Sequence, residues 1–122
     1  MNHMKILLIL FIIAFGFTAF AQDSPKTKEE KKVIGIITNL PEVVQLNKEM
    51  LYKTERPLII EVEQSPNVAD PYYTISVSEN LADRSFTYWR FCVQAKTFAV
   101  SYYDTIEGIK TSIAVWRKNG HQ

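Results

Sequence analysis

Hydrophobic and polar positions in this chain follow three successive patterns: an unbroken apolar run, a helical period and a strand period. The apolar run extends from Ile6 to Phe17, follows Lys5 and precedes Ala19-Phe20-Ala21. A positive charge, an apolar stretch and small residues, in that order, are the three parts of a secretory signal peptide. The stretch ending at Ala21 has 16 residues, whereas a membrane-spanning helix needs about 20. We therefore predict a signal peptide over residues 1–21, cleaved between Ala21 and Gln22.

Export follows from a signal peptide, so we expect the mature protein in the periplasm or outside the cell, with no membrane anchor. Cleavage of 21 of the 122 residues leaves 101, which is enough for one hydrophobic core and too few for two. Residues 22–32 contain lysines, glutamates and a proline but no large apolar side chain. We expect a flexible tether there, whose last residues run into a helix, and a single folded domain over residues 33–119.

The helical period begins where the tether is expected to end, with apolar side chains at Val33, Ile34, Ile37 and Leu40. This spacing predicts a helix over Lys28–Asn39. Pro41 then interrupts it, because proline lacks an amide hydrogen and disfavours helical geometry in the preceding residue. Proline is also common in the first turn of a helix. A second apolar stripe follows at Val43, Val44, Leu46, Met50 and Leu51. We predict one kinked helix or two short helices that end near Thr54.

After Pro57 the apolar residues alternate with polar ones, which is the period of a strand. Four such runs follow: Leu58–Glu63, Tyr72–Ser78, Tyr88–Val93 and Phe98–Tyr103. The links between them are short, and parallel neighbours would need crossovers of a dozen or more residues. We therefore predict a four-stranded antiparallel meander.

The segment after the fourth run permits two interpretations. Thr111 or Ser112 is suited to cap a short helix through Lys118, and Gly120 is placed to end it. A fifth strand over Ile113–Trp116 is the alternative.

These patterns predict an α+β domain in which the helices cover the apolar face of the sheet and leave the opposite face open. The alternation assigns Tyr72, Tyr88, Arg90 and Tyr103 to that open face. Tyrosine and arginine are enriched at binding hot spots, so these four residues form a candidate binding surface. The alternative is that cross-strand tyrosine pairs only stabilise an exposed sheet.

Charge and composition exclude several classes of function. Of 14 basic side chains Lys5 is lost with the signal peptide, which leaves 13 against 13 acidic ones, so neither nucleic acid nor an anionic membrane surface is expected as a partner. The histidines are His3, in the signal peptide, and His121. Hydrolytic triads and zinc sites lack an internal histidine. The four glycines are widely separated, so no phosphate-binding loop is present, and we expect no metal and no cofactor.

Cys92 is the single cysteine, so it has no partner for an intramolecular disulfide. An inert buried thiol is the favoured interpretation because free cysteine is among the most often buried residues. An intermolecular disulfide or a reactive thiol are the alternatives.

Paired carboxylates offer the remaining route to catalysis. Glu61 and Glu63 would project from one side of a strand, roughly 6 to 7 Å apart, which is compatible with a glycan-acting enzyme. The alternative is that these charges protect an edge strand from aggregation. An exposed edge strand would also allow a third function, that of a structural envelope component that self-associates.

Three short segments resemble the PepSY-like domains of exported bacterial proteins. They are Leu40-Pro41-Glu42-Val43, the strand Tyr72-Tyr73-Thr74-Ile75-Ser76-Val77, and the hairpin from Phe91 to Val100. Gln94-Ala95-Lys96 stands where the family often has aspartate and glycine in the hairpin turn. The resemblance, which covers Val33 to Asp104, implies a non-enzymatic extracytoplasmic module that binds or restrains another protein, such as a peptidase or a cell-envelope enzyme. It transfers no active-site residue.

Overall fold

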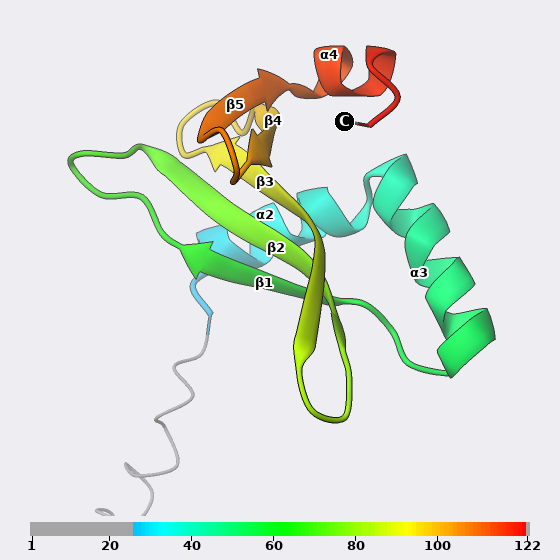
Figure 1. Ribbon diagram of the computed structural model, residues 1–122. Helices are drawn as coiled ribbons and strands as arrows, with labels where there is room; N and C mark the ends of the chain where they lie inside the picture. Colours follow the sequence, from blue (N-terminus) through cyan, green and yellow to red (C-terminus); the bar gives the residue numbers. More distant parts are fainter. Residues whose placement is uncertain (1–25, 122) are drawn as a thin grey trace, which may run out of the picture.

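The computed structural model describes residues 26–121, and Figure 1 shows its arrangement of helices and strands. In chain order the elements are α2 (Lys28–Thr38), α3 (Pro41–Thr54), β1 (Ile59–Gln64), β2 (Tyr72–Asn80), β3 (Ser85–Gln94), β4 (Val100–Asp104), β5 (Ile109–Ser112) and α4 (Ile113–Lys118). The predicted signal peptide and its cleavage point lie outside the described residues. Within residues 26–121, none of the helices is long and apolar enough to cross a membrane.

The predicted break between two helices is confirmed. Thr27 caps α2: its hydroxyl accepts from the Glu30 amide, and the Glu30 carboxylate accepts from the Thr27 amide, each at 3.1 Å. The helix therefore begins at Lys28, so residues 28–32 of the expected tether are helical. Leu40 is extended and Pro41 occupies the first turn of α3, which makes two separate helices and not one kinked helix.

The sheet is an antiparallel meander of five strands in the order β1-β2-β3-β4-β5, so the expectation of four strands is wrong. The additional strand, β5, arises in a segment that was expected to be loop and helix cap. Asp104 makes the β4–β5 turn, because its carboxylate accepts from the amides of Ile106 and Glu107 at 2.9 and 3.3 Å. Gly108 completes the turn with a positive φ of 69°, a conformation that glycine adopts without steric cost.

The chain after β5 forms a helix, so the alternative of a strand over Ile113–Trp116 is wrong. The Ser112 hydroxyl caps α4 by accepting from the Val115 amide at 3.3 Å, and Gly120 follows the helix with a φ of 72°. Trp116 is fully buried, stacks on Tyr102 with ring centres 5.0 Å apart, and meets Trp89 and Phe91 edge-on. This helix thereby attaches the end of the domain to the core.

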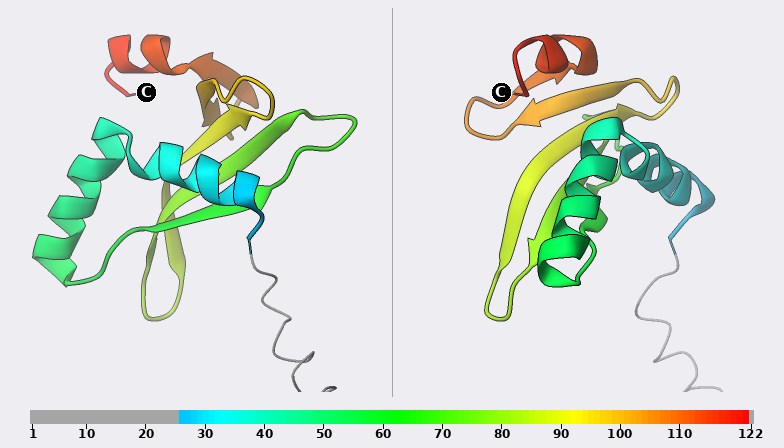
Figure 2. Two further views of the ribbon diagram at one scale, coloured as in Figure 1. Left: turned by 180° about the vertical axis from the view of Figure 1, so that it is seen from behind. Right: turned by 90° about the vertical axis from the view of Figure 1, so that its right-hand side faces the viewer.

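All the helices lie on one face of the sheet, as the edge-on view in Figure 2 shows for α2 and α3. The core on that face combines side chains from the helices and the sheet: Val33, Ile37, Val43, Leu58, Tyr73, Ile75, Val77, Phe91, Val93 and Trp116. The opposite, open face carries the alternate positions of each strand. The predicted division into a covered and an open face is confirmed.

Two β-bulges interrupt this alternation. In β1, Val62 pairs with Ile75 and Gln64 pairs with Thr74, which leaves Glu63 as the extra residue. In β3, Thr87 pairs with Ser78 and Trp89 with Val77, which leaves Tyr88 as the extra residue. A bulge places two successive side chains opposite one residue and so shifts the alternation by one position.

An ion-pair cluster joins the start of α3 to the end of the chain. The Glu42 carboxylate accepts from the Arg117 guanidinium at 2.8 and 3.2 Å and lies 3.3 Å from His121 Nε2. The hydrogen bonds from Arg117 hold the pKa of Glu42 below its usual value of 4.5, and burial only partly opposes them.

This cluster predicts a component of stability that depends on pH. Because the Glu42 pKa is lowered by folding, the component is fully present above pH 4.5 and is lost as the pH falls through the lower, folded-state value. Urea unfolding at a series of pH values should therefore show a smaller acid-induced loss of stability for Glu42→Gln than for the wild type. Equal losses in both proteins would contradict this role of the cluster.

Candidate functional site

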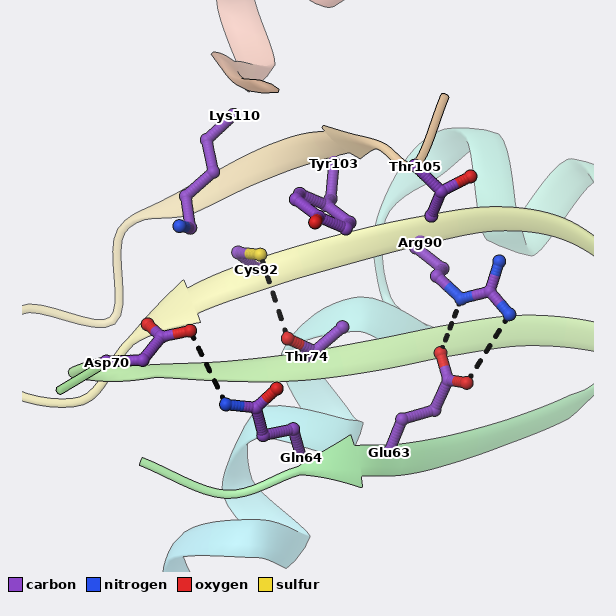
Figure 3. Close-up of a pocket in the computed structure, with 9 residues that line it drawn as sticks. All are labelled: Glu63, Gln64, Asp70, Thr74, Arg90, Cys92, Tyr103, Thr105 and Lys110. Atoms are coloured by element: carbon purple, nitrogen blue, oxygen red, sulfur yellow. Dashed lines mark hydrogen bonds and ion pairs between the residues drawn. The ribbon is translucent and has the colours of Figure 1, made fainter. Parts of the chain in front are cut away.

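The open face of the sheet contains a hollow of about 250 Å³, which we call the open-face hollow (Figure 3). Its lining comes from every strand and from adjoining loops: Glu63, Gln64, Asp70, Thr74, Arg90, Cys92, Tyr103, Thr105 and Lys110. In this view α2 and α3 lie behind the sheet, on the side opposite the hollow. Its walls are predominantly polar.

One end of the hollow is a fork of two charged side chains. Arg90 Nε donates to Glu63 Oε1 at 2.7 Å, and Arg90 Nη2 donates to Oε2 at 3.4 Å. The alternation of β1 places Glu63 on the open face, where Arg90 of β3 reaches it across β2. Both side chains are about one-third exposed, at 31% and 37%, so the pair contributes at most about 1 kcal/mol to stability. Its main effect is to fix the position of the guanidinium.

The other end of the hollow is formed by Lys110 and Asp70. Lys110 Nζ lies 4.7 Å from the ring centre of Tyr72 and 6.0 Å from that of Tyr103, distances at which a cation is attracted to an aromatic ring. Across residues 26–121, no ion pair with a carboxylate involves Lys110. Asp70 accepts from the Tyr72 amide at 3.2 Å and from the Gln64 side chain at 3.5 Å.

Thr74 and Cys92 form the floor between these ends (Figure 3). They are neighbours across β2 and β3, with the hydroxyl and the sulfur 4.0 Å apart. Burial raises the pKa of the Cys92 thiol, while the Thr74 hydroxyl and the Lys110 charge oppose that shift. The thiol is thus predominantly protonated at neutral pH, which agrees with the favoured interpretation of an inert buried cysteine.

The structure brings together three of the four predicted surface residues. Arg90 and Tyr103 line the open-face hollow, and Tyr72 borders it through its contact with Lys110. The side chain of Tyr88 does not point into the open-face hollow as predicted, because the bulge in β3 turns it toward the helices. Its hydroxyl is 3.4 Å from Met50 Sδ on α3.

On the helix-bearing side, the Tyr88 hydroxyl is hydrogen-bonded to a carboxylate. The hydroxyl donates to Glu79 Oε1 at 2.9 Å, and burial, with this neighbour, raises the Tyr88 pKa. Tyr88 also borders a smaller hollow of about 80 Å³, which Arg90 and Tyr103 share. Its hydroxyl, however, is directed away from the open face.

Sequence reasoning missed Thr105 and Lys110 as site residues, because both belong to the unpredicted β4–β5 hairpin. The sequence predicts Glu63 only as half of a carboxylate pair with Glu61, yet Glu61 does not line the hollow. The signal for Lys110 was the alternation Ile109, Lys110, Thr111, Ser112, which is short and contains only one large apolar residue.

Two further properties of the described residues bear on chemistry. Within residues 26–121, no three side chains of His, Cys, Asp or Glu lie close enough to hold a metal ion. A second hollow, of about 400 Å³, lies on the helix-bearing side between α2, α3 and β1, and its lining includes Val43, Val44, Leu58 and Ile60.

Comparison with protein-family models, with curated proteins and with solved structures finds no match to this chain.

Proposed function

We propose that the chain is a small exported binding module with no catalytic activity of its own. Its partner is another envelope or extracellular protein, which docks on the open face of the sheet. The observation that carries the proposal is the convergence of Arg90, Tyr103 and Lys110 on one exposed hollow. Arginine and tyrosine are the side chains that most often dominate binding energy at protein interfaces.

The resemblance to PepSY-like domains gives the proposal its second support. It suggests that binding restrains the partner, such as a peptidase or an envelope enzyme. A restraining module needs a rigid surface and no reactive group of its own. The Arg90–Glu63 fork supports the first requirement, because two hydrogen bonds hold the guanidinium in one position.

The alternative of a glycan-acting enzyme draws no support from the arrangement of the carboxylates. Glu63 is held by two hydrogen bonds from Arg90, and Glu61 is exposed outside the hollow. A pair that divides acid and base roles needs both carboxylates to reach the same bond.

The test is affinity capture from an envelope extract of the source organism, followed by quantitative mass spectrometry. We expect one protein to be enriched, and we expect Arg90→Ala combined with Tyr103→Ala to reduce its recovery at least about tenfold, because two hot-spot residues each contribute more than about 1 kcal/mol.

Tyr88→Phe is the matched control, since it removes a hydroxyl that faces the helices. It should leave capture unchanged, and thermal unfolding should show that all variants are folded. Equal recovery with the double variant, or no enriched protein at all, would overturn the proposal.

A further inference from the structure

We propose that the open-face hollow binds one neutral saccharide unit, a sugar ring whose hydroxyl and amide groups both donate and accept hydrogen bonds. The inference rests on the proposed function only in taking the open face as the binding surface. It adds a ligand class that a protein partner alone does not specify.

The first argument is the charge balance of the lining. Glu63 and Asp70 supply two negative charges, and Arg90 and Lys110 supply two positive ones. Each end of the hollow holds one charge of each sign, as Figure 3 shows. An anionic ligand would lie against the two carboxylates, and a cationic ligand would lie against the two basic groups. Like charges at close range are unfavourable, so the lining selects a ligand without net charge.

The second argument is the mixture of hydrogen-bonding groups. The Arg90 guanidinium carries five N–H donors, and two of its nitrogens donate to Glu63. The carboxylates offer lone pairs only, while the hydroxyls of Tyr103 and Thr105 both donate and accept. Phosphate or sulfate offers no donor to the carboxylate lone pairs that remain free, and an ammonium group offers no acceptor to the guanidinium N–H groups that remain free. A sugar ring matches both the donors and the acceptors of the lining, because its hydroxyl groups donate and accept.

The third argument is size and shape. At about 250 Å³ the hollow is smaller than the roughly 300–1,000 Å³ of sites for drug-sized ligands. It therefore fits one ring and not an extended peptide. The Tyr103 ring offers an apolar wall with a polar tip, next to which the carbon side of a sugar can pack. A ligand of about 15 non-hydrogen atoms in such a site should bind with a Kd on the order of 1 mM.

The test is a ligand-observed NMR titration of the full exported chain with three methyl glycosides at pH 6.5. The neutral probe is that of N-acetylglucosamine, the anionic probe that of glucuronic acid and the cationic probe that of glucosamine. We expect the neutral probe to bind with a Kd on the order of 1 mM. Each charged probe should bind about fivefold more weakly, the effect of a partly exposed charge pair.

Single substitutions that change the charge of the lining should change the relative affinities of the charged probes, each in favour of the opposite charge. Glu63→Gln leaves the lining with one net positive charge, so the affinity for the anionic probe should rise about fivefold. Lys110→Gln leaves one net negative charge, so the affinity for the cationic probe should rise by a similar factor. Glu61→Gln is the matched control for the first, because Glu61 lies on the same strand outside the hollow. Lys118→Gln on α4 is the control for the second.

The outcomes separate this proposal from the proposed function. Absence of binding by the neutral probe at tens of millimolar, or an equal change with Glu61→Gln and Glu63→Gln, would overturn the saccharide site. If the open-face variants then still lost the captured protein, the proposed function would stand without it.

Where the neutral probe does bind, adding it to the captured complex distinguishes two sources of the sugar. Release of the partner, together with loss of its capture after it has been deglycosylated, means that the partner carries the glycan. Retention means that the hollow takes a free glycan of the envelope.

Discussion

Replacing Trp116 by alanine is expected to lower the free energy of unfolding by about 3–5 kcal/mol. The indole is fully buried and contacts the rings of Trp89, Phe91 and Tyr102, so its removal leaves a cavity where α4 meets the sheet. For a domain of this size each kcal/mol shifts the midpoint of thermal unfolding by about 4–8 °C. Calorimetry or circular dichroism melting of purified Trp116→Ala checks the prediction.

Two further substitutions on the same helix make this result interpretable. Val115→Ala removes a side chain that is 46% exposed and should change stability by no more than about 0.5 kcal/mol. Trp116→Phe should cost much less than Trp116→Ala. It keeps an aromatic ring in the cluster and removes the indole N–H, which is the one buried side-chain polar atom without a partner in the described part of the chain. A midpoint for Trp116→Ala that matched the wild type would mean that α4 is not docked in solution.

The second large effect is expected in α2, with Ile37→Ala. Ile37 and Val33 are both fully buried and attach α2 to the sheet. Truncating a buried isoleucine to alanine costs about 2–5 kcal/mol, depending on how far the cavity collapses. Denaturant unfolding should show a lower midpoint with an unchanged slope, since the same surface is exposed on unfolding.

Thr38→Ala is the control for Ile37→Ala. Thr38 is the next residue in α2, is exposed, and its hydroxyl donates only to the Ile34 carbonyl within the helix. We expect its effect to stay within about 0.5 kcal/mol. Comparable losses for both variants would show that the stability comes from the helix itself and not from its packing on the sheet.

Much of the fold follows from local sequence signals. Pro41 separated two apolar stripes of helical spacing, and the boundaries of α2 and α3 lie within one residue of those expected. The meander followed from short links between alternating runs. The fifth strand did not, because β5 has four residues, one large apolar side chain and a turn that depends on Asp104 and Gly108. A strand so short is defined by its pairing with β4, which local composition does not encode.

The site was predictable only where the alternation of the strands holds. Arg90 and Tyr103 obey it and lie on the open face. Glu63 obeys it too, but Gln64 and Tyr88 do not, because a bulge beside each of them moves the alternation by one position without any strong signal in the sequence. The helix-side contacts of Tyr88 therefore required the three-dimensional arrangement.

The meander has a kinetic consequence. Each strand pairs with its neighbour in sequence, so most of the sheet closes through short loops, which is the topology associated with fast folding. The contact of Glu42 with Arg117 is of a different kind, because it closes a separation of 75 residues. We expect that closure to be completed after the hairpins, so that weakening the α3–α4 junction raises the unfolding rate while leaving the refolding rate nearly constant.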